Sequence, residues 1–167
     1  MYKVSLAIPI YNVSLFVERA LLSVLNQTYD NIEYLIVDDK GQDDSMDIVH
    51  RIIKDHPRGK DVRIIEHPYN IGLGATRNTA IDNAQGEYLF FMDSDDEIIP
   101  TCIEILVHKM QEHPVDFIAA SHMKKDLSGK TYPTYTYSPI LIQGDDLPVA
   151  QYRYAQNNDC LLYTSDA

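Results

Sequence analysis

The chain contains 167 residues, of which 45% are hydrophobic and 23% charged, a balance typical of one globular domain and unlike a disordered or fibrous chain. Its 25 acidic residues exceed its 14 basic residues and give a net charge of −11, which excludes general electrostatic binding of nucleic acid. An anionic ligand would therefore need a local counter-charge, which a divalent cation can supply.

We expect no membrane segment and no secretion signal in this chain. No apolar run approaches the roughly 18 residues that a membrane-spanning helix needs. The N-terminus begins a strand-like pattern at once and lacks a small-residue cleavage site. Cys102 and Cys160 lie far apart without metal-ligand spacing, so a reduced, cytoplasmic setting is predicted.

Short apolar runs alternate along the first two-thirds of the chain with segments whose apolar residues recur every three or four positions. The runs predict strands at residues 3–10, 32–37, 62–65, 88–92 and 117–120. The periodic segments predict helices after Asn12 as an N-cap, after a cap at 43–45, over 75–84, and from Pro100 as the first helical residue. This alternation predicts an α/β domain with a mostly parallel sheet flanked by helices.

The pattern changes after about residue 121. Residues 124–130 are polar and turn-like, and 131–137 predict an edge ribbon, because Pro133 cannot donate to a strand ladder. A last helix could open at Asp145. The final eight residues, 160–167 (CLLYTSDA), resemble the translation of a transposon adapter used in sequencing libraries, and we interpret them as non-native read-through.

Polar residues gather where the predicted strands end. They are Tyr11 and Asn12, together with Pro9, at the end of the first strand, Asp38 and Asp39 at the end of the second, the segment 67–77 after the third, and 93–96 at the end of the fourth. In open α/β sheets, ligands bind outside the carboxyl ends of the strands. Four separate segments are therefore predicted to meet at one edge of the sheet and to form a binding site.

The segment Asp93-Ser94-Asp95-Asp96 places three carboxylates within four residues, directly after an apolar run. These carboxylates repel one another unless a cation is near, and Mg²⁺ or Mn²⁺ accepts such ligands together with water and phosphate oxygens. The alternative interpretation is an acidic cluster before the helix at Pro100, since Asp favours helix starts.

Two further segments each allow two interpretations. Asp38 or Asp39 could accept hydrogen bonds from a nucleobase imide or a ribose hydroxyl, or could form a turn with its own backbone. The glycine-rich run from Gly72 to Asn78 is a poor match to a dinucleotide fingerprint. Its helix N-terminus and Arg77 could receive phosphate charge, or the run could be a tight turn with Arg77 paired to local acids.

Taken together, six blocks resemble those of family 2 glycosyltransferases, in the family's order and spacing, over roughly residues 3–120. The blocks are VSLAIPIYN (4–12), SVLNQTY (23–29), IVDD (36–39), NIGLGATRNTA (70–80), GEY (86–88) and DSDD (93–96). The resemblance implies the GT-A fold, a Rossmann-like α/β domain that binds a nucleotide-sugar, here C-terminally truncated.

The resemblance also implies roles for individual residues. Tyr11 would lie against the base and Asp39 would accept from its imide nitrogen, with Pro9 and Asp38 in the same nucleotide-sugar-binding set. Lys40 departs from the small or polar residues usual after the acid pair, which affects the details of base binding.

On the phosphate side, Arg77 would face the donor diphosphate. Asp93 would contact the ribose or the metal, and Asp95 would ligate the metal, Mg²⁺ or Mn²⁺, through the diphosphate. Asp96 would support these two carboxylates without direct ligation.

The activity implied is metal-dependent, inverting transfer of a sugar from a nucleotide-sugar, with a UDP-sugar expected first, to a hydroxyl of a glycan or lipid-linked acceptor. The setting implied is synthesis of cell-envelope polysaccharide or glycan, in the cytoplasm or at the inner face of the membrane. The alternative is a non-catalytic nucleotide-binding or partner module with the same fold. A phosphoacceptor receiver domain fits poorly, because its acid pair would follow the first strand.

The resemblance divides the chain into a nucleotide-sugar-binding core at 1–123 and the start of an acceptor-side region at 124–159. The family's catalytic base is a later carboxylate, and its block is not found in this sequence. Asp145, Asp146 and Asp159 are candidates by charge alone. We therefore expect the base beyond the chain end and no transfer by this chain alone.

Overall fold

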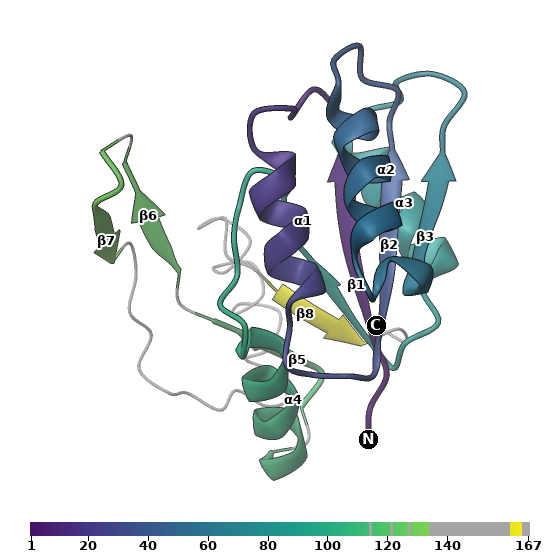
Figure 1. Ribbon diagram of the computed structural model, residues 1–167. Coiled ribbons are helices and arrows are strands. Elements are labelled where there is room, and N and C mark those ends of the chain that lie inside the picture. The colour runs from purple at the N-terminus through teal and green to yellow at the C-terminus, as the bar shows by residue number, and fades with distance from the viewer. Residues whose placement is uncertain (114, 121, 127, 134–160, 165–167) are drawn as a thin grey trace.

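Figure 1 shows the computed structural model, which describes residues 1–113, 115–120, 122–126, 128–133 and 161–164. The strands are β1 (Val4–Ile10), β2 (Ile32–Asp38), β3 (Val62–Glu66), β4 (Tyr88–Phe91), β5 (Phe117–Ala119), β6 (Met123–Lys125), β7 (Thr131–Pro133) and β8 (Leu161–Thr164). The helices are α1 (Val17–Leu25), α2 (Ser45–Asp55), α3 (Leu73–Asn83) and α4 (Cys102–Glu112), with a 3₁₀ turn, η1, at Gly59–Asp61.

The main sheet has the strand order β3-β2-β1-β4-β8-β5. The first four strands in this order are parallel, and β8 is antiparallel to both β4 and β5. The chain moves outward from β1 to β2 and β3 and then returns to the other side of β1 with β4, so the strand order reverses between β1 and β4. The predicted α/β class and mostly parallel sheet are confirmed, and this reversal is where ligands bind in such sheets.

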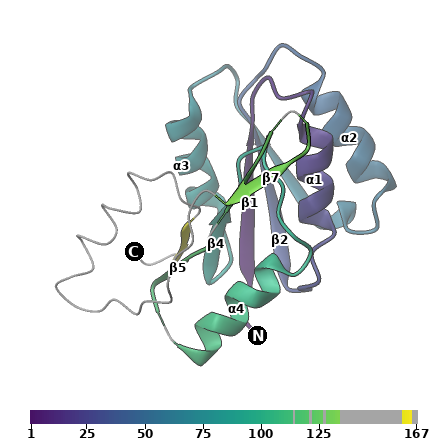
Figure 2. The same ribbon diagram turned by 90° about the vertical axis from the view of Figure 1, so that its left-hand side faces the viewer.

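Alternating residues of β1 divide the core into two layers. Figures 1 and 2 show helices on both sides of the sheet. Leu6 and Ile8 pack in the larger cluster with apolar residues of α1, α2 and α4, which cover one face. Ala7 points to the other face, where it packs in a cluster with Leu35 and with Ala80 of α3. Helix α3 therefore covers this second face of the sheet, and the other three helices cover the first face.

The helix starts differ from the sequence prediction. Asn12 does not cap α1, which begins five residues later; it has a φ of 52°, and its side-chain oxygen accepts from Gln42 N at 2.7 Å. Asparagine tolerates this left-handed conformation better than most residues, so Asn12 shapes the loop after β1 and not the helix. Pro100 lies two residues before α4, and its carbonyl accepts from Thr28 N at 2.8 Å. Helix α3 begins at Leu73, two residues earlier than predicted.

The predictions for the part of the chain after residue 121 can be compared with the structure only at the residues that it describes. Strands β6 and β7 pair antiparallel in a separate two-stranded sheet, so the ribbon is present over 131–133. Residues 134–137, the helix expected at Asp145, and the candidate bases Asp145, Asp146 and Asp159 lie outside the described residues. The division at 123 and the read-through interpretation of 160–167 remain predictions. Within the described ranges, no helix has both the length and the apolar character to cross a bilayer.

Candidate functional site

A cleft of about 430 Å³ opens at the carboxyl ends of β1 and β4, beside the first turn of α3. Five of the residues predicted to form a site line this cleft: Pro9, Tyr11, Asp39, Asp93 and Asp95. Residues from β1, β2, β4 and the loop before α3 thus meet at one place, as the sheet-edge argument predicts. Its volume lies within the range of ordinary ligand clefts.

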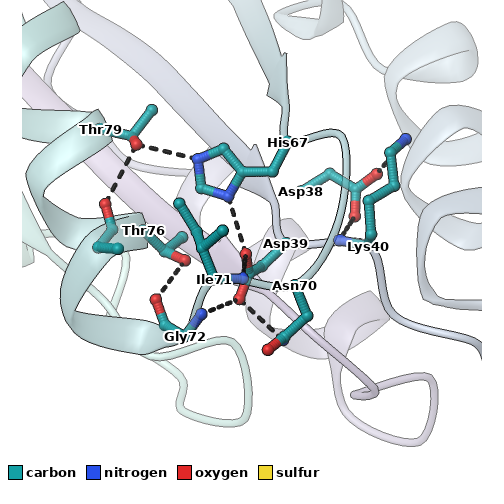
Figure 3. Close-up of polar contacts among 10 residues, drawn as sticks. Asp38, Asp39, Lys40, His67, Asn70, Ile71, Gly72, Thr76 and Thr79 are labelled. Atoms are coloured by element: carbon teal, nitrogen blue, oxygen red, sulfur yellow. Dashed lines mark hydrogen bonds and ion pairs between the residues drawn. The ribbon is translucent and has the colours of Figure 1, made fainter.

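Asp39 is the most fully bonded side chain of the site. Its Oδ1 accepts from His67 Nδ1 at 2.8 Å and from Ile71 N at 2.9 Å, and its Oδ2 accepts from Asn70 Nδ2 and Gly72 N, both at 2.9 Å (Figure 3). Only 2% of Asp39 is exposed. Burial would raise its pKa, but the hydrogen bonds from Ile71, His67 and Gly72 outweigh burial and hold the pKa below its ordinary value.

These four bonds match the acceptor capacity of a carboxylate, which is about four lone pairs. Asp39 therefore organises the segment 70–72 directly. A nucleobase N–H could reach it only by displacing one of the present donors. Asn70 and Ile71 are the exposed residues of that set, and only Asn70 donates from its side chain among these two. Its amide oxygen points away from Asp39 because its nitrogen faces the carboxylate (Figure 3).

Gly72 joins this segment to α3. Its φ of 88° is one that L side chains rarely adopt, although a Cβ at this position would meet no atom within 4 Å. Its carbonyl accepts from Thr76 N at 3.0 Å and from Thr76 Oγ1 at 2.9 Å, which opens the helix. The glycine is needed for backbone conformation, so the glycine-rich run is a helix-opening turn beside the cleft.

His67 is a buried residue of the 67–77 segment to which the sequence assigns no role of its own. Its Nε2 lies 2.9 Å from Thr79 Oγ1 of α3, so the ring bridges Asp39 and this helix. The register of β2 and β3 pairs Asp38 with Glu66, which places Asp39 and His67 side by side at the strand ends. A prediction that β3 lies beside β2 would have placed His67 next to Asp39, whereas the spacing of residues along the sequence could not.

Asp38 does not line the cleft with Asp39. Its carboxylate accepts from Lys40 N at 2.8 Å and contacts Lys40 Nζ at 3.2 Å. Lys40 Nζ also lies 2.7 Å from Glu66, and Lys40 itself has a φ of 54°. Consecutive residues of an extended chain point to opposite sides, so only one of the two acids can face the cleft. Here that residue is Asp39.

Arg77 is not among the described residues that line the cleft, but it contacts the acidic segment that forms the other side of the cleft. Arg77 Nη2 donates to Asp93 Oδ1 at 2.8 Å, whereas Asp95 makes no hydrogen bond or ion pair with the described residues. Partial burial and the Asp95 and Asp93 carboxylates raise the pKa of Asp96, against a smaller effect of His122. Of these three carboxylates, only Asp93 pairs with Arg77 among the described residues.

The described residues contain no group of three or more His, Cys, Asp or Glu side chains arranged to hold a metal ion. Asp93 and Asp95 alone offer a two-carboxylate donor set. Mg²⁺ sites of this kind are completed by water and by the oxygens of a bound phosphate. The donor chemistry therefore fits a metal that binds together with an anionic ligand.

A sequence model described as glycosyl transferase family 2 matches residues 5–159, which is most of the chain. The chain belongs to glycosyl transferase family 2. This family 2 chain is 32% identical over 151 residues to an uncharacterized glycosyltransferase of Haemophilus influenzae, with 87% of this chain and 59% of that protein aligned. It is 37% identical over 129 residues to UDP-Glc:alpha-D-GlcNAc-diphosphoundecaprenol beta-1,3-glucosyltransferase WfaP of Escherichia coli, over 75% of this chain and 49% of WfaP. The chain thus spans about half the length of these two curated relatives.

Solved structures confirm the GT-A fold. TarS of S. aureus, in complex with UDP-GlcNAc, superposes with a TM-score of 0.63 and 28% identity over 69% of this family 2 chain and 33% of TarS. A mannosyltransferase of Pyrobaculum calidifontis superposes with a TM-score of 0.64 over 70% of this chain and 34% of that one, and at 24% identity it supports the fold alone.

Proposed function

We propose that this chain binds the nucleotide-sugar donor of a glycosyltransferase, with UDP-sugars as the first candidates. The observation that carries the proposal is that Asp39, which follows β2, lines one cleft with Asp93 and Asp95, which follow β4, at the point where the strand order reverses. The UDP-GlcNAc bound by TarS and the UDP-Glc in the name of WfaP support the choice of a UDP-sugar.

The base and ribose occupy the part of the cleft near Pro9, Tyr11 and Asp39 in this proposal. Tyr11 is 47% exposed, so its ring is available to stack on a base. Asp39 fixes the wall of this subsite. It accepts a hydrogen bond from the base only when one of its present donors is displaced. Asn70 becomes an additional candidate, because its exposed amide is the donor most easily exchanged.

The diphosphate lies between the first turn of α3 and the acidic segment. The helix N-terminus favours negative charge, and Arg77 can donate to two phosphate oxygens at once. Asp93 and Asp95 would repel the diphosphate without a cation, so we assign Mg²⁺ or Mn²⁺ to these two carboxylates. When bound, such an ion stabilises negative charge on the departing nucleoside diphosphate.

The proposed reaction is displacement at the anomeric carbon of the sugar, with inversion. The acceptor hydroxyl attacks, the bond to the nucleoside diphosphate breaks, and a carboxylate base takes the hydroxyl proton. We assign no such base among the described residues, so we expect donor binding but no transfer by this chain alone.

The acceptor proposed for the whole protein is a lipid-linked glycan. WfaP, whose name specifies a diphosphoundecaprenol acceptor, supports it. Synthesis of cell-envelope polysaccharide, in the cytoplasm or at the inner face of the membrane, is the corresponding setting.

Calorimetric titration of the chain with UDP in the presence of Mn²⁺ tests the proposal. We expect binding that Asp95→Asn weakens about tenfold or more, because a charged ligand to the site is lost. Asp47→Asn, at an exposed position on α2, removes the same charge and serves as the matched control. Failure of UDP and of other nucleoside diphosphates to bind would refute the proposal. Binding that is indifferent to Asp95→Asn, without sugar transfer by the whole protein, would favour a non-catalytic module.

A further inference from the structure

A buried line of polar side chains runs from α3 to the back of the cleft. Thr79 contacts His67, and His67 contacts Asp39 (Figure 3). We infer that His67 is a positioning residue for donor binding: it holds Asp39 and, through Asp39, the 70–72 segment that forms one wall of the cleft. The inference rests on the proposed function, which supplies the ligand of that wall.

The acceptor character of Asp39 determines which nitrogen of the His67 ring carries hydrogen. Oδ1 of Asp39 lies 2.8 Å from Nδ1, and an ionised carboxylate only accepts, so Nδ1 donates. A neutral ring then has Nε2 as an acceptor, and the Thr79 hydroxyl lies 2.9 Å from Nε2 and 3.1 Å from the Ala75 carbonyl, so its one hydrogen has two acceptors within reach. Asp39 therefore determines the tautomer, and Thr79 contacts the opposite side of the ring.

The ring is also fixed through its own backbone. His67 N donates to the Asp38 carbonyl at 2.9 Å, which continues the strand pairing by one residue. The side chains of His67 and Asp39 are 8% and 3% exposed, so water cannot easily replace either partner. The ring is held from three directions: the strand end, the helix and the carboxylate.

Asp39 in turn fixes the position of the cleft wall. It accepts from the backbone N–H groups of Ile71 and Gly72 and from the Asn70 amide, and Asn70 and Gly72 line the cleft. A rotation of the Asp39 carboxylate would move all three groups at once. Because neither His67 nor Thr79 is among the described residues that line the cleft, both act through Asp39 and not by touching the ligand.

Two substitutions at His67 distinguish a role in positioning Asp39 from a role in packing alone. His67→Asn keeps an N–H donor near the position of Nδ1, whereas His67→Leu removes both ring donors and acceptors at similar bulk. We expect His67→Leu to weaken UDP binding about tenfold or more, and His67→Asn to stay within about threefold of the unmodified chain. The backbone amide signals of Ile71 and Gly72 in ¹H–¹⁵N NMR spectra should shift strongly only in His67→Leu. The carboxyl of Asp39 should titrate at higher pH in that variant, because a hydrogen bond to its charged form is lost.

Equal UDP affinity in folded His67→Leu and His67→Asn would overturn the inference, since a packing role predicts no rescue by asparagine. If His67→Leu does not fold, Thr79→Val and Thr79→Ser replace the pair. Valine, which lacks the hydroxyl, should then weaken binding while serine retains it, and equal affinities would contradict the inference. An unmodified chain that binds no nucleoside diphosphate would refute the proposed function and the inferred role in binding, and the NMR signals would still report whether His67 holds the 70–72 segment.

Discussion

Arg77 Nη2 donates to Asp93 Oδ1 at 2.8 Å and so connects the first turns of α3 with the carboxyl end of β4. Both side chains are partly exposed, at 40% and 49%, and exposed ion pairs contribute little to stability, typically less than about 1 kcal/mol. The pair is therefore easily exchanged for other partners. A diphosphate would draw the guanidinium, and a cation would draw the carboxylate.

Arg77→Gln should weaken UDP binding about tenfold or more, because a charged donor to the phosphates is lost. The free energy of unfolding should change by less than about 1 kcal/mol. Arg51→Gln is the matched control: Arg51 forms an exposed ion pair with Glu18 at 3.1 Å on the α1 and α2 surface. Isothermal titration of both variants makes the comparison, and equal affinities would remove Arg77 from the site.

Asp39→Asn and Asp38→Asn should differ sharply, although the two residues are adjacent and both buried. Asparagine at 39 cannot accept from four donors, so we expect a loss of about 2–3 kcal/mol in unfolding free energy and weaker UDP binding. Asp38 bonds to Lys40 outside the cleft, so its variant should lose stability while the folded protein retains UDP affinity. Urea denaturation and calorimetry together test this pair, and loss of affinity in both variants would place Asp38 in the site after all.

Asp43 should contribute stability that depends on pH. Burial would raise its pKa, but hydrogen bonds from Ser45 and Ser14 lower it from 3.8 to about 2. Because the folded pKa lies below the unfolded one, this stabilisation is complete above about pH 4–5 and disappears as the pH falls through about 2. Urea midpoints of the unmodified chain and Asp43→Asn should differ at pH 7 and converge towards pH 2, and a constant difference would contradict the assignment.

The sequence contains enough to predict the sheet and much of the cleft. The apolar runs that became β2 and β4 mark their strands, and the carboxyl ends of these strands bring Asp39, Asp93 and Asp95 together. The choice of Asp39 over Asp38 depends on the side to which each points at the end of β2, which the DD pair alone does not show.

The partners of Asp39 could not be predicted from spacing, since His67 reaches it only because β3 lies beside β2. Thr79 lies in α3 and becomes a neighbour of His67 only when α3 packs on the sheet. The residue type of Asn12 predicts a helix cap, whereas in the structure Asn12 adopts a left-handed conformation and its side chain accepts from Gln42 N. Tertiary contacts determine all three positions.

Alanine substitution should lower the stability of the protein at Gly86 and raise it at Gly74. A Cβ on Gly86 would lie 2.6 Å from Ser5 N and 2.7 Å from the Lys3 carbonyl, both backbone atoms that cannot easily move. We expect Gly86→Ala to cost about 1–3 kcal/mol. Gly74, in the first turn of α3, has no atom within 4 Å of an added Cβ, so Gly74→Ala should stabilise by about 0.5–1 kcal/mol. Thermal unfolding of the two variants tests whether Gly86 is required by close packing.

Paramagnetic broadening by Mn²⁺ is the most direct measurement of where a donor nucleotide binds. With UDP and substoichiometric Mn²⁺, the backbone amide signals of Asp93, Asp95 and Gly72 should lose intensity first. The signals of residues near Gln111, at the far end of α4, should stay sharp. Broadening centred anywhere other than this cleft, or identical spectra with and without UDP, would contradict a nucleotide site shared by these strands.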